Sequence, residues 1–420
     1  MVDWSMPKSR GRRKATGSKP VCRSPLPPRR SDLLLRDARQ LTGPTDPLMA
    51  EVWASSWLGQ AWVTAELSER EAEHRLCMEV TGRACTKPTP HGLAAIAALA
   101  RVAPATDITM LAETIDILTE TQPLPPWYTA MSADAAWTAT SAWRAVDVWD
   151  REQVLLVDYD GPHPHTLMVQ VLKPGGLMIG KIAVLEPGAA AQWDQRHESD
   201  EVPMPITQAP VAEVLADLAD ALRTTDITWP RNDDEDFVDN RALAWSRCRD
   251  HLPAWPERDG LPEAERHRLI QEFTSTSHTD DDVSRSLAEL FLDYGEGYMI
   301  SGPLTWSPDE VMLLLTDWLP RKAVLDAEQR AALPDVLRRW VAYALVRRGV
   351  DAPWITPVVD AVDAHLPAFR QAFDDGTSWG PAKQIAAALT DRGIDLTDRQ
   401  AVDDAIHALN AERLARRLLP

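Results

Sequence analysis

Apolar residues recur at helical spacing through the first third of the chain, residues 32–149. The stretch LSEREAEHRLCMEVTG offers Ser68 as an N-cap, Glu71 as its capping-box partner and Gly82 as a stop signal. PHGLAAIAALARVAP and TDITMLAETIDILTE predict two more short helices. Because only a few residues separate these segments, we expect antiparallel helical hairpins, with the proline-rich stretch QPLPPWYTAM as a break.

The last third, residues 261–420, returns to the helical pattern. In WSPDEVMLLLTDWLP, Ser307 is the expected N-cap and Glu310 completes a capping box. LPDVLRRWVAYALVRRG predicts a helix that ends at Gly349. Its apolar face consists of Leu337, Trp340, Val341, Ala344 and Leu345. LTDRQAVDDAIHALNAERLARRL predicts one more helix near the end of the chain.

The middle of the chain, residues 150–260, changes period. QVLLVDY, TLMVQVL and LMIGKIAVLE are rich in β-formers and are separated by the turn signals DGPHPH and KPGG. They predict a three-stranded antiparallel meander. Because three strands alone are marginally stable, we expect the helix in APVAEVLADLADALR to cover the sheet. Its apolar face is Val211, Val214, Leu215, Leu218 and Leu222.

RNDDEDFVDNR is predicted to be an acidic loop. It is not an EF-hand, because Phe237 stands where the turn glycine must be. KPGGLMIG lacks the Lys-Ser/Thr pair of a phosphate-binding loop and is explained as a turn between strands. The predicted fold class is therefore α+β, mainly helical, with a small three-stranded antiparallel meander in the middle.

The charge is unevenly distributed over the 420 residues. Residues 1–31 are predicted to be a disordered tail and carry nine basic groups and one acidic group, a net charge of +8. Because the whole chain has a net charge of −19, the remaining residues carry a net charge of −27. Because so acidic a body repels polyanions, sequence-independent contact with nucleic acid must run through the tail. Alternatively, the tail is solvated or folds back onto the body. The candidate contact residues are Arg10, Arg12, Arg13, Lys14 and Lys19.

The four cysteines, Cys22, Cys77, Cys85 and Cys248, form no CxxC pair. This indicates reduced thiols rather than a disulfide framework or a zinc ribbon. We find no signal-peptide pattern, and the most apolar runs fall short of the roughly 18 residues that span a bilayer. These features predict a cytoplasmic protein without membrane contact.

One short stretch gathers groups that could carry chemistry. VLLVDYDGPHPHTLMV contains Asp158, Asp160, His163 and His165. A two-residue turn at Gly161-Pro162 would bring all four to one face, where they would suit a divalent transition metal or acid–base catalysis. However, proline is disfavoured at that turn position, so we expect a longer loop over residues 160–165, in which the aspartates cap the turn and bond a nearby histidine.

Other catalytic patterns are absent from the sequence, including GxSxG, a helix-starting SxxK and HExxH. The chain has 17 Trp against five Phe and five Tyr. Tryptophans with helical spacing, such as Trp53 and Trp57, serve either in packing or as anchors for a partner.

Four stretches, PPWYTAM, VLLVDYDGPHPHTLMVQVLKPGGL, DWLPRKAVL and WGPAKQIAAALTDRGIDLTD, together resemble a family of uncharacterised bacterial proteins. The resemblance implies a shared architecture over most of the chain after the tail, but no catalytic residue or ligand. The resemblance adds nothing to function. From the residues themselves, we expect a non-enzymatic cytoplasmic interaction protein that binds another protein, uses its basic tail for charge-driven contact and needs no cofactor. The alternative is a metal-dependent hydrolase in which the Asp/His cluster holds a metal that activates water.

Overall fold

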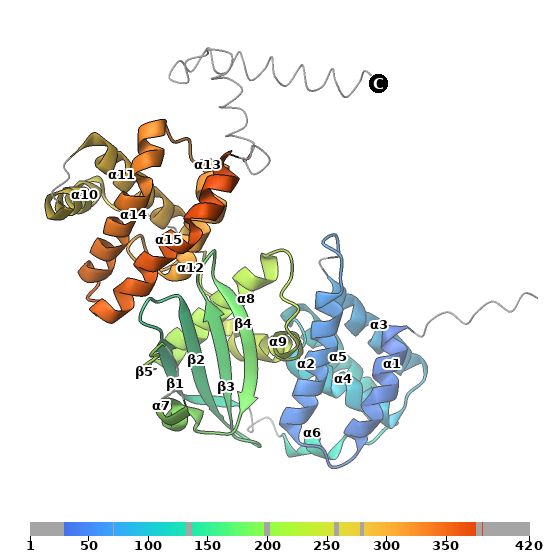
Figure 1. Ribbon diagram of the computed structural model, residues 1–420. Helices are drawn as coiled ribbons and strands as arrows, with labels where there is room; N and C mark the ends of the chain where they lie inside the picture. Colours follow the sequence, from blue (N-terminus) through green and yellow to red (C-terminus); the bar gives the residue numbers. More distant parts are fainter. Residues whose placement is uncertain are drawn as a thin grey trace, which may run out of the picture.

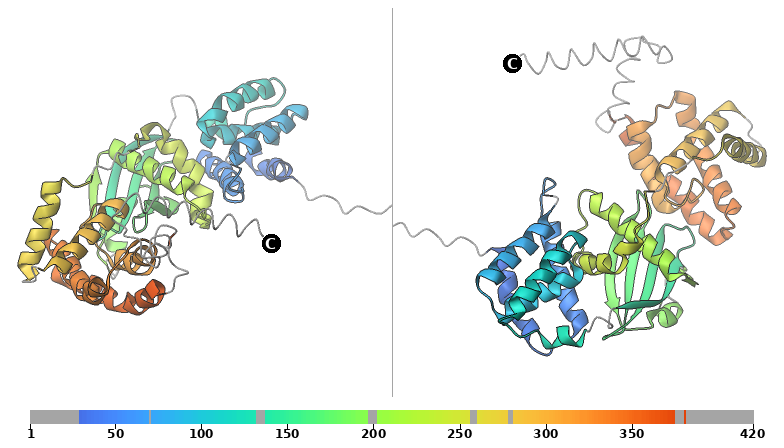
Figure 2. Two further views of the ribbon diagram at one scale, coloured as in Figure 1. Left: turned by 90° about the horizontal axis from the view of Figure 1, so that it is seen from above. Right: turned by 180° about the vertical axis from the view of Figure 1, so that it is seen from behind.

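The computed structural model describes residues 29–69, 71–131, 137–196, 202–255, 260–277, 281–374 and 380. A β-sheet with its covering helices lies in the middle (Figure 1). An N-terminal helical body flanks the sheet on one side, and a C-terminal helical body packs against one end of the sheet (Figure 2). The prediction of a mainly helical α+β fold is confirmed.

The described residues of the N-terminal body form a 3-10 helix (Ala38–Thr42) and six α-helices. The α-helices are α1 (Arg30–Asp37), α2 (Pro47–Val63), α3 (Ala72–Thr86), α4 (Pro90–Val102), α5 (Ala105–Thr119) and α6 (Pro126–Ala130). The side chains of Asp46 and Thr89 cap α2 and α4, each of which has proline at its first position. Helix α4 is buried around its whole circumference and forms the centre of this core.

Three local expectations for this region are wrong. Helix α3 begins at Ala72, with Glu71 rather than Ser68 at its N-cap position. It continues through Gly82 to Thr86, because a glycine inside a helix weakens it without ending it. Arg30 and Ser31, assigned to the tail, already belong to α1.

The sheet has five antiparallel strands, not three. They are β1 (Thr138–Val146), β2 (Glu152–Asp160), β3 (His165–Leu172), β4 (Met178–Leu185) and β5 (Ile206–Ala209), in the order β4-β3-β2-β1-β5. The predicted meander is β2, β3 and β4. Strand β1, TATSAWRAV, lies in the segment predicted to be helical, and its polar residues hide its period. Strand β5 has only four residues, too few to show a pattern.

Helices α8 (Val211–Ile227) and α9 (Glu235–Cys248) cover one face of the sheet. The predicted apolar face of α8 is the one that packs there. The other face is covered by a short 3-10 turn (Ala189–Gln192) and by α7 (Trp193–Arg196). The stretch RNDDEDFVDNR (residues 231–241), predicted to be an acidic loop, is a loop only in its first part. Asp234 caps α9, and the helix begins at the next residue.

The N-terminal body is joined to the sheet through a close crossing of α2 and α9. A Cβ atom on Gly59 of α2 would lie 1.8 Å from the carbonyl oxygen of Val238, so only glycine fits. One turn earlier, Ser55 Oγ accepts a hydrogen bond from the Leu243 backbone amide at 3.0 Å. The side chain of Asn240 donates to the Ile182 carbonyl, which protects the outer edge of β4.

The C-terminal body contains α10 (Glu263–Ser277), α11 (Asp282–Tyr298), α12 (Pro308–Leu313), a π-helical turn (Leu314–Trp318), α13 (Leu319–Lys322), α14 (Ala327–Arg347) and α15 (Ala352–Asp374). The predicted apolar face of α14 is fully buried, and Trp340 on it serves in packing. The helix predicted near the chain end lies outside the described residues. Among those described, no helix has both the length and the apolar character needed to cross a membrane.

Candidate functional site

The loop between β2 and β3 decides how the predicted Asp/His cluster is arranged. Tyr159 pairs with His165 and Asp158 with Thr166, so five residues, 160–164, lie between the innermost pair, and the strand bounds leave residues 161–164 as the loop. The two-residue turn is wrong, and the longer loop is right. Because side chains alternate along a strand, Asp158 faces the side covered by α7, whereas His165 faces α8 and α9.

The four predicted residues have separate surroundings. Asp158 accepts hydrogen bonds from Thr166 Oγ1 at 2.5 Å and from Ser141 Oγ at 3.3 Å. Asp160 is exposed, and His163 pairs with Asp46 at the start of α2. Within the described ranges, no three His, Cys, Asp or Glu side chains are grouped to hold a metal ion. A metal at these residues stays a prediction without geometric support.

The predicted polyanion-contact residues lie outside the described part of the chain. They are Arg10, Arg12, Arg13, Lys14 and Lys19. Charge-driven contact of the tail with nucleic acid therefore stays a prediction.

The two histidines of the loop line a cavity of about 390 Å³, which we call the histidine groove. It lies between the start of α2, the start of α9 and the ends of β3 and β4. Its apolar lining is Leu48, Met49, Val52, Pro164, Ala183, Val184 and Leu185. Its polar lining is His163, His165, Glu186, Asp236 and Asn240. Polar and apolar atoms contribute about equally to its lining. A hollow that combines apolar walls with a few polar groups is a candidate binding site.

His165 is held in one tautomer. Its ring stacks on Tyr159 with centroids 5.2 Å apart, meets Trp137 edge-on and is only 2% exposed. Nδ1 lies 3.0 Å from the backbone carbonyl oxygen of His163. Because a carbonyl only accepts, Nδ1 carries the proton. Burial lowers the pKa of His165, against the opposing effect of that hydrogen bond, so the ring is neutral near pH 7.

The second ring nitrogen is therefore a hydrogen-bond acceptor. Nε2 of His165 is buried and has no hydrogen-bond partner in the described structure. A buried polar atom without a partner costs roughly 1–3 kcal/mol, so a donor that reaches it is favoured. Of the two groove carboxylates, Glu186 is exposed and Asp236 pairs with Lys181 at 2.6 Å. The groove thus offers the carboxylates of Glu186 and Asp236 beside apolar side chains, and the unpartnered Nε2 belongs to a residue that lines it.

A buried ion cluster lies beside the histidine groove, next to Val52 and His165 of its lining. Glu51 of α2 is fully buried and accepts hydrogen bonds from Arg101 Nε at 2.9 Å, Arg247 Nη2 at 2.5 Å and Trp137 Nε1 at 2.8 Å. Burial alone would raise the pKa of Glu51, but the two guanidinium groups and the hydrogen bonds hold it below its usual value. The Arg247 guanidinium also lies over the rings of Trp137 and Tyr159.

This cluster fixes the N-terminal body, α9 and the sheet relative to one another. Sequence reasoning missed it, because its members come from distant segments and form no motif. The only local signal was Glu51 itself, a charged residue among the apolar residues of α2.

Comparisons with known proteins add no assignment. No family model, no curated protein and no solved structure matches the chain. A function is therefore argued from the histidine groove itself.

Proposed function

We propose that this chain is a non-enzymatic interaction protein whose histidine groove binds a segment of another protein that carries a Lys or Arg side chain among apolar residues. The observation that carries the proposal is a groove that combines apolar walls with the carboxylates of Glu186 and Asp236 and is also lined by His165, whose buried Nε2 is an unpartnered acceptor. A cytoplasmic location, inferred from the unpaired cysteines, belongs to the same proposal.

The groove chemistry favours a hydrogen-bond donor over an acceptor. A neutral His165 whose Nδ1–H is already used can only accept at Nε2. Lys and Arg side chains carry only donors at their ends, and Glu186 adds negative charge for them. Their aliphatic stems suit an apolar wall such as that formed by Val52 and Leu185.

The fixed geometry of His165 also favours binding over proton transfer. The stacked ring and the backbone hydrogen bond hold one tautomer, and burial keeps the ring neutral. The neighbouring His163 is paired with Asp46. A rigid acceptor of this kind recognises a donor without a change in its own protonation.

The test is a selection of random twelve-residue peptides on the full-length protein, followed by calorimetric titration of the selected peptides. We expect enrichment of peptides that combine Lys or Arg with apolar residues. Glu186→Lys should weaken their binding at least tenfold, because it reverses a charge at the groove. Glu289→Lys reverses an exposed charge on α11 and is the matched control, with unchanged affinity expected.

A second variant addresses the acceptor. His165→Phe keeps a ring to stack on Tyr159 but has no acceptor nitrogen, so it should bind the selected peptides more weakly while its melting curve stays cooperative. The proposal fails if the selected peptides are acidic or lack Lys and Arg. It also fails if Glu186→Lys and Glu289→Lys bind them equally well.

A further inference from the structure

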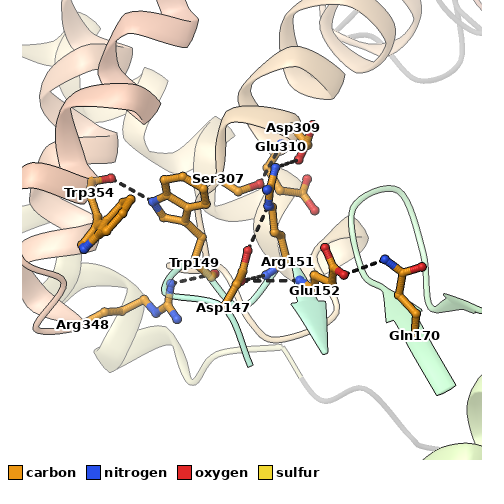
Figure 3. Close-up of polar contacts among 10 residues, drawn as sticks. All are labelled: Asp147, Trp149, Arg151, Glu152, Gln170, Ser307, Asp309, Glu310, Arg348 and Trp354. Atoms are coloured by element: carbon orange, nitrogen blue, oxygen red, sulfur yellow. Dashed lines mark hydrogen bonds and ion pairs between the residues drawn. The ribbon is translucent and has the colours of Figure 1, made fainter. Parts of the chain in front are cut away.

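Two turns of the sheet contact the C-terminal body, and Figure 3 shows the side chains of the β1–β2 turn at this junction. In the β1–β2 turn, Trp149 is buried in the C-terminal core. Its Nε1 donates to the Trp354 carbonyl oxygen at 2.8 Å. The Trp149 carbonyl oxygen in turn accepts from Arg348 Nη1 at 3.1 Å. This tryptophan attaches the sheet to the C-terminal helices.

Two cations at the junction, Arg151 and Lys173, already have carboxylate partners. Arg151 lies between Asp147, 2.9 Å from its Nε, and Asp309 of α12, 2.8 Å from its Nη1. In the β3–β4 turn, Lys173 pairs with Asp150 at 2.5 Å. Each of these ion pairs balances charge at the junction or beside it.

Glu310 of α12 differs from these carboxylates. It is 4% exposed and forms no ion pair with any described residue. Tyr294 of α11 donates to its Oε2 at 2.7 Å. The backbone of Gly175 in the β3–β4 turn lies near enough to the carboxyl group to lower its pKa by hydrogen bonding. Asp309, its neighbour on α12, adds a like charge. The carboxyl group therefore joins the two bodies without a counter-charge.

We propose that Glu310 controls how tightly the C-terminal helical body docks on the sheet, with tight docking while Glu310 is protonated and looser docking once it is ionised. A buried carboxylate without a cation is poorly solvated, and separation of the two bodies gives it water. A protonated carboxyl group carries no such cost and can still share its hydrogen bond with Tyr294, whose hydroxyl both donates and accepts.

The direction of the pH effect follows from linkage. Burial raises the pKa of Glu310 from 4.5 to about 7, with Asp309 acting in the same direction and the hydrogen bonds from Tyr294 and Gly175 opposing it. The docked state therefore binds the proton more tightly than the open state. Docking is tightest below pH 4.5 and weakens as the pH rises through about 7. Between pH 6 and 8, this linkage gives an increase of about tenfold in the opening equilibrium.

The experiment is hydrogen exchange of the full-length protein at pH 6 and pH 8, corrected for the intrinsic exchange rate and read by mass spectrometry. The readout is the protection of amides in residues 147–151 and 173–176. We expect protection in both turns to fall about tenfold from pH 6 to 8. Amides of α4 in the N-terminal body should keep theirs.

The variants separate Glu310 from other sources of pH dependence. Glu310→Gln is neutral at every pH and should abolish the pH dependence. Glu152→Gln, which alters a carboxyl group that pairs with Gln170 at the same junction, is the matched control and should retain it. Tyr294→Phe removes a hydrogen bond that favours the ionised form, so the midpoint of the transition should move to higher pH.

Two results would overturn the proposal. One is equal protection of the turns at pH 6 and pH 8 in the wild-type protein. The other is a Glu310→Gln protein with the pH dependence of the wild type. If Glu310→Gln does not fold, the direction of the Tyr294→Phe shift decides, and an unchanged or lower midpoint refutes the proposal.

Discussion

Glu51→Gln tests whether the buried ion cluster holds the N-terminal body and the sheet together. The substitution keeps the shape of the side chain but removes its charge. Arg247, whose side chain is 6% exposed, then loses the carboxylate 2.5 Å away, and Arg101 loses the one at 2.9 Å. Breaking a buried pair by removal of one partner costs about 3–5 kcal/mol, because the remaining charge stays buried. For a cooperative unit of roughly 200 residues, such a loss of unfolding free energy corresponds to a drop of roughly 10 °C in melting temperature.

The assay is thermal and urea unfolding of the full-length protein, followed by circular dichroism. Glu69→Gln, which removes a carboxylate from an exposed pair with Arg75, is the control and should leave the transition in place. If an unpaired Arg247 causes the loss, the double variant Glu51→Gln/Arg247→Met should be more stable than Glu51→Gln alone. A melting temperature for Glu51→Gln equal to that of the wild type would refute the reasoning, and so would a double variant with the summed losses of the two single changes.

The same variant has a defined pH dependence. The pKa of Glu51 is lower in the folded protein than its usual 4.5, so the cluster stabilises the fold above that pH and the effect is lost as the pH falls through the folded value. The difference between the wild type and Glu51→Gln should therefore shrink in acid. A difference that grows below pH 4.5 would contradict this account.

Gly59→Ala should lower the melting temperature strongly, because the new Cβ would meet the Val238 carbonyl oxygen, whereas Gly82→Ala, with nothing within 4 Å, should stabilise α3 by about 0.5–1 kcal/mol. Equal melting temperatures for the two variants would contradict the close crossing. Burial raises the pKa of the Cys77 and Cys248 thiols, so both should resist iodoacetamide at pH 8 until the protein unfolds, while the exposed cysteine near the end of α3 reacts. Alkylation of either buried thiol in the native state, detected by mass spectrometry, would show that its core opens.

The elements that could be predicted are those whose periodicity reports burial of one face. The apolar faces of α8 and α14 and the three strands β2, β3 and β4 follow from local spacing, because each element buries a single continuous stripe. Strand β1 was not predicted, because Thr138, Ser141 and Arg144 give it a polar composition. It gains its place in the sheet from its hydrogen bonds to β2 and β5, which no local pattern encodes.

The junction at α12 shows where local reasoning stops. Ser307 caps the helix as predicted, since its Oγ accepts from the Glu310 amide at 3.1 Å. The predicted return bond of the capping box is replaced, because the Glu310 side chain bonds Tyr294 across the core. A side chain that satisfies a local rule in isolation can take a tertiary partner instead when it is buried beside one.

The sequence by itself determined the fold class, several helices (among them α4, α5, α8 and α14), the central meander and a loop of more than two residues between β2 and β3. Only the tertiary structure decided which side chains share a surface. The register across that loop sends Asp158 and His165 to opposite faces. The carboxylate of Glu51 meets Arg101 and Arg247, 50 and 196 residues further along the chain. The physical reason is that periodicity records local exposure, whereas ion pairs and hydrogen bonds between distant segments depend on how the finished elements pack.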